Sequence, residues 1–221
     1  MIPAPPFAVN VTAFRDPYAF QSSILDKSVN STKGTWYVAI SGGVHDVGPT
    51  QFLYRQNDAE FQYWEYLGQW WNEPVNSTWG KGEWAGGWGF NFEVGNVFGL
   101  NAEGYSDDGE IFITLGTEGS GLPIVPQVSS IHDMLWATGN VTNDDGVTFK
   151  PTMAGVLDWG LSAYAAAGKV LPASSQASEK SGAPDRFISY VWLTGDLFEL
   201  AKGFPTAQQN WTGVLLLPRE L

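Results

Sequence analysis

Cysteine is absent from this chain of 221 residues. Its absence excludes disulfide bonds, thiolate catalysis and zinc sites with cysteine ligands. Histidine is scarce, since only His45 and His132 are present and they have no metal-ligand spacing between them. The Gly-x-Ser-x-Gly motif of many hydrolases is missing as well. The sequence therefore predicts no metal and no cofactor, and it leaves carboxylates as the groups that could carry chemistry.

Charged residues are also few, and most of them are acidic. They make up 15% of the chain, against roughly 25% in ordinary soluble domains. With 11 Lys and Arg against 23 Asp and Glu, the formal net charge is −12. Nucleic acids and anionic membranes require clustered basic residues, so neither is expected as a partner. The charge fits a neutral or cationic ligand.

Long apolar runs are missing too. None approaches the roughly 20 residues of a membrane span, and residues 1–6 have neither the basic nor the apolar region of a signal peptide. Five triplets nevertheless match the N-glycosylation pattern, where about 1.5 would arise by chance. Their asparagines are Asn10, Asn30, Asn76, Asn140 and Asn210. The sequence predicts a secreted glycoprotein, and we expect the chain to begin within a longer protein.

Glycine and aromatic residues are abundant. The chain contains 26 Gly, 11 Trp, 13 Phe and 8 Tyr, and 43% of its residues are hydrophobic. Aromatic side chains suit half-buried strands and glycine suits tight turns, so an all-β fold is predicted. The expected strands are Thr35–Ser41, Gln51–Arg55, Glu60–Leu67, Glu110–Leu115, Phe187–Leu193 and Gly213–Leu217. These patterns alone leave a sandwich, a barrel and a propeller open.

A few segments have sequence patterns that indicate a helix, a loop or a nucleotide-binding motif instead of a strand. Leu161–Leu171, with three consecutive alanines, is the one predicted helix, although Gly168 interrupts it. The polar stretches Gln21–Gly34 and Pro172–Arg186 are predicted to be long surface loops. Gly80–Ala85 matches a dinucleotide-binding fingerprint in form, but no βαβ pattern surrounds it and nucleotide binding is not expected.

Glu93 is an acidic residue within the apolar segment Trp88–Phe98. On a strand, Asn91, Glu93 and Gly95 would share one face and Phe92 the other. An acid in such a segment must be paired, solvated in a cleft or functional. The competing interpretation is a solvent-facing glutamate on an edge strand.

Other polar candidates have ordinary explanations beside the functional one. Asp16 lies in Arg15-Asp16-Pro17, where proline predicts an extended aspartate, and this tripeptide is usually a turn. Glu118 lies in a glycine-rich segment and could be a solvated loop residue. His132 could be a hydrogen-bonded core histidine.

Taken together, the segments resemble glycoside hydrolase family 32, the family of invertases, inulinases and fructosyltransferases, and in particular its secreted fungal members. The likeness runs from Pro6 to Leu221. The segments that carry it are Phe14–Pro17, Ser41–His45, Gln51–Arg55, Phe92–Gly95, Gly116–Trp136, Asp158–Lys169 and Gly203–Leu221.

The resemblance implies a five-bladed β-propeller with a funnel-shaped site on its axis, and a retaining mechanism with three acidic residues. Glu93 matches the general acid/base of the family, and Asp16 matches the transition-state stabiliser that holds two fructose hydroxyls. The residues that match substrate-binding positions are Arg15, Glu118, His132 and Tyr164.

Two departures from the family pattern stand out. The acid/base usually precedes Cys-Pro, whereas Val94 and Gly95 follow Glu93. The family nucleophile is an aspartate before proline in the first blade, and the only Asp-Pro pair here is Asp16-Pro17. Residues 1–221 are therefore expected to form most of the propeller without its first blade, and without the β-sandwich that normally follows.

Two functions remain open at this point. The first is an enzyme that acts on β-fructofuranosides by hydrolysis, fructosyl transfer or both. This chain would be a part of that enzyme, and in isolation it would be inactive and poorly soluble. The second is a non-catalytic propeller in which Asp16, Glu118 and His132 bind a fructoside without cleaving it.

Overall fold

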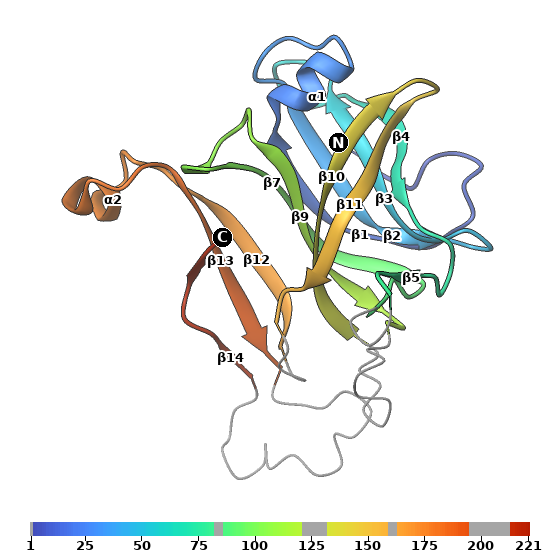
Figure 1. The fold of residues 1–221 in the computed structure, drawn as a ribbon. Helices are drawn as coiled ribbons and strands as arrows, with labels where there is room; N and C mark the ends of the chain where they lie inside the picture. The colour runs from blue at the N-terminus through green and yellow to red at the C-terminus, as the bar shows by residue number, and fades with distance from the viewer. Residues whose placement is uncertain (1, 82–85, 121–131, 159–162, 195–212) are drawn as a thin grey trace.

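The computed structural model describes residues 2–81, 86–120, 132–158, 163–194 and 213–221. Most of these residues lie in three β-sheets (Figure 1). The first sheet has the order β1-β2-β3-β4, with strands Val11–Gln21, Trp36–Val44, Gly48–Gln56 and Trp64–Asn72. The predicted all-β fold class is therefore confirmed.

The second sheet has the order β11-β10-β9-β7-β8. Its strands are β7 (Asn91–Asn101), β8 (Gly104–Tyr105), β9 (Glu110–Glu118), β10 (His132–Asn143) and β11 (Val147–Val156). A short ribbon precedes it, in which β5 (Thr78–Trp79) pairs with β6 (Gly86–Gly87). All of these pairs are antiparallel.

The third sheet is built on β13. Its strands are β12 (Ala163–Leu171), β13 (Arg186–Leu193), β14 (Val214–Leu215) and β15 (Arg219–Glu220). Figure 1 shows the second sheet between the first and the third, with the β12–β13 hairpin extending to one side.

Two six-residue helices, α1 (Ser23–Ser28) and α2 (Gln176–Ser181), lie within the segments predicted to be loops. Each begins after a serine whose hydroxyl accepts a hydrogen bond from a first-turn amide, from Leu25 and from Ser178 respectively. Helices this short give no periodic sequence signal, and hence the sequence did not reveal them.

The predicted helix at Leu161–Leu171 is wrong, because its described part forms strand β12. Ala166 is almost completely buried, and a Cβ on Gly168 would come within 2.4 Å of the Phe187 ring. Small residues are therefore needed here for close packing, and tertiary context overrides the helix propensity of alanine. The predicted strand from Glu60 begins only at Trp64, after a turn.

The main hydrophobic core lies between the first two sheets. Trp71 of β4 packs against Phe92 of β7 with ring centroids 4.7 Å apart, and against Phe149 of β11 at 5.1 Å. All three side chains are essentially inaccessible to solvent. Between the second and third sheets, Phe98 stacks on Phe187 at 3.8 Å. The abundant aromatic residues thus fill the spaces between sheets.

Side chains also join the first strands of the three sheets. Asn96 on β7 donates to the carbonyl of Ala166 and accepts from the amide of Gly168, both on β12, at 2.8 and 3.0 Å. The Tyr18 hydroxyl on β1 donates to the Gly168 carbonyl at 3.0 Å. These contacts hold β1, β7 and β12 next to one another, and the candidate residues lie on these strands and on β9 and β10.

Within the described residues, no helix is both long enough and apolar enough to cross a membrane. Several features predicted from the sequence extend beyond the described residues. Among them, the fingerprint at Gly80–Ala85 includes residues 82–85, the predicted helix begins at residues 161–162, and the sequon asparagine Asn210 lies in the segment 195–212.

Candidate active site

Strands β1, β7 and β12 each contain a β-bulge next to a predicted site residue. The pairing register shifts within Arg15–Tyr18, Glu93–Asn96 and Tyr164–Ala167. In each bulge one non-glycine residue has a positive φ, namely Asp16 at 54°, Val94 at 42° and Ala165 at 49°. Bulges re-aim side chains, and strained backbone gathers at functional sites. The three bulges therefore mark one site shared by three sheets.

Asp16 does not have the extended backbone that the following proline predicts. Its φ of 54° is left-handed, a conformation that aspartate tolerates better than most residues. The bulge explains this difference, because it turns Asp16 so that its Oδ2 accepts a hydrogen bond from the Val94 amide at 3.0 Å. The Asp16 carboxylate is thereby fixed to the residue that follows Glu93.

Glu93 is half-buried, with 14% of its side chain exposed. Arg15 donates to its Oε1 and the Tyr164 hydroxyl donates to its Oε2. Phe92 packs in the core against Trp71, on the other face of β7, as the strand alternation predicts. The immediate environment of Glu93 is thus polar and highly organised.

Glu118 is the last residue of β9 and not part of a loop. Its Oε2 accepts two hydrogen bonds at 2.7 Å, one from the guanidinium of Arg15 and one from the side-chain amide of Asn91. Arg15 therefore bridges the carboxylates of Glu93 and Glu118. Sequence reasoning missed Asn91 as a site residue, although the strand alternation placed it on the same face as Glu93.

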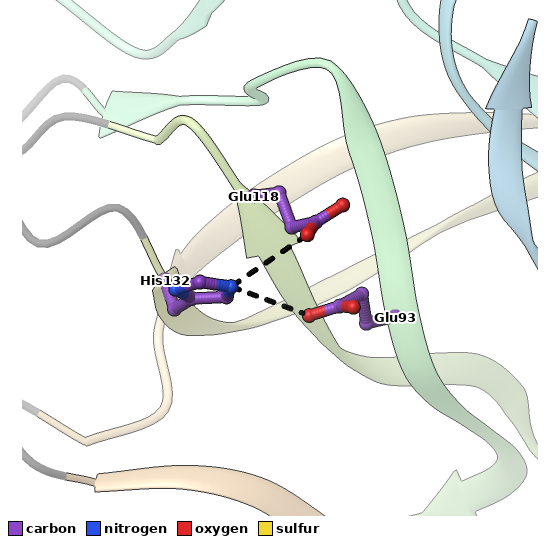
Figure 2. A group of neighbouring side chains, drawn as sticks. All are labelled: Glu93, Glu118 and His132. Atoms are coloured by element: carbon purple, nitrogen blue, oxygen red, sulfur yellow. Dashed lines mark ion pairs between the residues drawn. The ribbon is translucent and has the colours of Figure 1, made fainter. Parts of the chain in front are cut away.

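His132 begins β10, where it pairs directly with Glu118 across the sheet. Its Nε2 lies 3.8 Å from Oε2 of Glu93 and 3.7 Å from Oε1 of Glu118 (Figure 2). The imidazole ring also makes an edge-on contact with Tyr164, with centroids 5.1 Å apart. His132 thus lies close to both carboxylates, with 15% of its side chain exposed, and its role in substrate binding stays a prediction.

Tyr164 and Arg15 have fixed protonation states. Burial, reinforced by Glu93 and Glu118, raises the pKa of Tyr164, so the phenol stays protonated and donates to Glu93. Burial opposes the charge of Arg15, but the two carboxylates outweigh it and raise the pKa of Arg15 above its ordinary value. Both residues therefore act as hydrogen-bond donors at all physiological pH values.

The ligand atoms of Glu93, Glu118 and His132 lie within 4.8 Å of one another, a spacing that could hold a metal ion. Arg15 already contacts both carboxylates with its guanidinium, so a divalent cation would compete with that charge. The arrangement is better suited to neutral hydroxyl groups, which can both donate to the carboxylates and accept from Arg15.

The structure brings Arg15, Glu93, Glu118, His132 and Tyr164 into one cluster, and it joins Asp16 to that cluster through the Val94 amide. The side chains come from five strands in three sheets, β1, β7, β9, β10 and β12. The roles assigned to these residues from the sequence remain predictions.

No protein-family model and no curated protein sequence matches this chain. Solved structures do match it. Aspergillus kawachii β-fructofuranosidase, complexed with glycerol, is 69% identical with a TM-score of 0.91, over 99% of this chain and 36% of that one. The fructosyltransferase from A. japonicus is 61% identical with a TM-score of 0.87, over 97% and 39% of the two chains.

A distant match shares the fold. The GH32 β-fructofuranosidase of Bombyx mori, in complex with sucrose, is 18% identical with a TM-score of 0.61, over 96% of this chain and 35% of that one. The chain thus spans a little over a third of the length of the solved structures that it matches.

Proposed function

Because this chain belongs to glycoside hydrolase family 32, we propose that it carries the acid/base half of a site that cleaves β-fructofuranosides such as sucrose, fructo-oligosaccharides and inulin-type fructans. The observation that carries the proposal is the cluster around Glu93, where Arg15, Tyr164, Glu118 and His132 converge. Hydrolysis and fructosyl transfer differ only in the acceptor, water or a sugar hydroxyl.

In the proposed mechanism Glu93 protonates the leaving oxygen of the glycosidic bond and later activates the acceptor. Tyr164 and Arg15 orient the Glu93 carboxyl group, each through one of its oxygens. Asp16, fixed by the Val94 amide, stabilises the positive charge that develops on the fructosyl ring. Glu118 and His132 bind hydroxyl groups of the substrate.

A retaining mechanism also needs a carboxylate that attacks the anomeric carbon and forms a covalent intermediate. The family nucleophile is an aspartate before proline, and the only such aspartate here, Asp16, already has another role. We therefore assign the attack to a segment outside residues 1–221. On this assignment the isolated chain binds fructosides but does not split them.

We further propose that residues 1–221 form most of a five-bladed catalytic propeller. The order of the sheets supports this, because the adjacent strands β1, β7 and β12 are each the first strand of a separate antiparallel sheet. The TM-score of 0.91 over 99% of the chain also supports it. The site would then lie on the axis of the propeller.

The decisive experiment measures glucose and fructose release from sucrose by the 221-residue chain and by a version extended at both ends to the length of the Aspergillus structures. We expect turnover only from the extended protein. In it, Glu93→Gln should lower kcat by about 10²–10⁴-fold with a smaller change in KM, because the proton donor is lost while the pocket keeps its shape.

The outcomes separate the two functions. If the extended protein binds sucrose without splitting it, the non-catalytic sugar-binding propeller is the better interpretation. Robust turnover by the 221-residue chain would refute the assignment of the nucleophile, and a fully active Glu93→Gln variant would remove Glu93 from the mechanism.

We also propose that the natural protein is secreted and glycosylated. Four of its five sequon asparagines, Asn10, Asn30, Asn76 and Asn140, are solvent-exposed, as an attached glycan requires. We expect material secreted from a eukaryotic host to gain electrophoretic mobility after N-glycosidase treatment. Unchanged mobility would contradict the proposal, and a variant with glutamine at all four positions is the matched control.

A further inference from the structure

Asn91 is a buried polar residue on β7 that pairs with Glu118 on the neighbouring strand β9. Only 5% of its surface is exposed, and both ends of its side-chain amide are hydrogen-bonded. Its Nδ2 donates to Oε2 of Glu118 at 2.7 Å, and its Oδ1 accepts from the hydroxyl of Thr12 at 2.5 Å. Asn91 therefore joins the first sheet to the carboxylate of Glu118 with one amide in a defined orientation.

Two local features create space for this contact. The ladder between β1 and β2 is irregular between Val11 and Ala13, so Thr12 leaves the regular pairing. On β2, a Cβ added to Gly43 would lie 2.4 Å from Oδ1 of Asn91 and 2.5 Å from the Thr12 hydroxyl. Any side chain at position 43 would therefore displace the Thr12–Asn91 pair.

The Thr12–Asn91 pair determines how the carboxylate of Glu118 is oriented. Its Oε2 is occupied by Asn91 and Arg15, whereas Oε1 lies 3.7 Å from Nε2 of His132. Two donors on a single oxygen fix the rotation of the carboxylate and leave Oε1 as the oxygen available to a ligand. Charge-assisted hydrogen bonds of this kind are roughly twice as strong as neutral ones.

We infer that Asn91, anchored by Thr12, is a positioning residue that fixes Glu118 for binding a fructoside hydroxyl. The inference rests on the proposed function and deepens it, because it explains how the binding carboxylate is held. Asn91 itself does not contact the substrate and acts only through Glu118.

The test measures the dissociation constant of sucrose by surface plasmon resonance, with the 221-residue chain immobilised on the sensor so that it cannot self-associate. Bacterial expression avoids N-glycans, so a change at Thr12 does not alter the glycosylation of Asn10. Asn91→Ala should weaken binding about tenfold, the effect of losing one hydrogen bond to a charged group. Asn143→Ala is the control, because the side-chain amide of Asn143 donates a hydrogen bond to the Ser28 carbonyl, remote from Glu118.

Asn91→Asp distinguishes the positioning role from a purely structural one, because only the positioning role predicts that the effect on sucrose binding changes with pH. The substituted side chain keeps its shape but loses the donor and sets a carboxylate against Glu118, so binding at pH 7 should be weaker than for Asn91→Ala. Acidification protonates the introduced group and restores a donor. The ratio of the variant to the wild-type dissociation constant should therefore shrink between pH 7 and pH 4, with Arg15, Glu93, Glu118 and His132 common to both proteins.

Thr12 gives an independent arm of the experiment. Thr12→Val removes the hydroxyl and should weaken sucrose binding several-fold, whereas Thr12→Ser retains the hydroxyl and should bind like the wild type. The inference is overturned if the wild type binds sucrose and Asn91→Ala binds it equally well, or if the Asn91→Asp ratio stays constant with pH. If the wild type itself binds no fructoside, the proposed function fails instead.

Discussion

At the scale of single residues, the guanidinium of Arg15 holds the carboxylates of Glu93 and Glu118 together. Residue types and a family resemblance pointed to Glu93 and His132, and the structure brings them within 3.8 Å of each other. Asn91 remained hidden, because a buried asparagine has no distinctive local pattern. Its importance depends on Thr12, which is 79 positions away in sequence.

Glu73 provides a pH-dependent prediction at this scale. Burial raises the pKa of Glu73 above its ordinary value, despite a hydrogen bond from Trp71 Nε1 at 2.9 Å. The folded state therefore binds this proton more tightly than the unfolded state, and stability falls as pH rises from the ordinary value through the raised one. We expect Glu73→Gln to melt at a higher temperature than the wild type at pH 7.

The same two proteins should differ less at pH 4, where the Glu73 carboxyl group is largely protonated in the folded state. Thermal melts across pH 4–7 measure the difference, with the exposed Glu103→Gln as the control. An equal gain at both pH values would show that the ionisation of Glu73 is not the cause.

At the scale of strands, the bulge in β7 is the feature on which the geometry of Glu93 depends. Val94 is β-branched and has φ 42°, a conformation that costs about 1–3 kcal/mol. Glycine adopts it freely, although it loses about 0.5–1 kcal/mol through the greater freedom of the unfolded chain. Val94 also packs against the cluster that contains Met134 and Tyr164, so Val94→Gly loses that packing while it relieves the strain. Val94→Gly should therefore lower the melting temperature less than Val156→Gly does, and it should weaken sucrose binding.

Differential scanning calorimetry and the sucrose titration would check this pair of effects. Val156→Gly is the control, because Val156 is a half-buried strand residue without a positive φ, and its loss should only destabilise. If Val94→Gly destabilises as much as Val156→Gly does, the bulge stores no strain.

Strand β12 shows why some elements escaped prediction. Buried and exposed positions alternate from Ala166 to Lys169 as in any strand, but the residues are Ala, Ala, Gly and Lys. Because alanine and glycine differ little in hydropathy, the sequence does not show the apolar–polar alternation by which a strand is predicted. Strands with aromatic and β-branched residues were predicted more closely: β13 to within one residue, and β2 except for its last three residues.

At the scale of the whole molecule, the outward face of the third sheet is apolar and uncovered in the described structure. Phe187, Ser189 and Val191 of β13 face inward, whereas Tyr190 and Trp192 are 44% and 38% exposed. Leu215 on β14 is 65% exposed. Exposed apolar strands of this kind promote association.

We therefore expect the isolated chain to self-associate at micromolar concentrations. Sedimentation velocity should show larger species that diminish in a double variant, Tyr190→Ser with Trp192→Ser. Met153→Ser is the control, because Met153 is a single exposed apolar residue on another sheet. A monodisperse wild-type monomer with a cooperative melt would contradict the prediction.

Composition established the all-β class, and the resemblance established the family, but neither could order the sheets in space. That order depends on contacts such as Asn96 with Ala166 and Tyr18 with Gly168, which join residues 70 and 150 positions apart. Contacts over such separations depend on the whole fold, so only the three-dimensional structure reveals them.

The way in which the first strands are joined has a consequence for the order of folding. Most strand pairs within a sheet join strands that follow one another in the sequence, so they close short loops and can form early. The site needs contacts between sheets, such as Val94 with Asp16 and Tyr164 with Glu93, which close loops of more than 70 residues. Affinity for a sugar should therefore arise in the last docking step, after nearly all the strands have formed, and local opening of one sheet would abolish it without unfolding the other two.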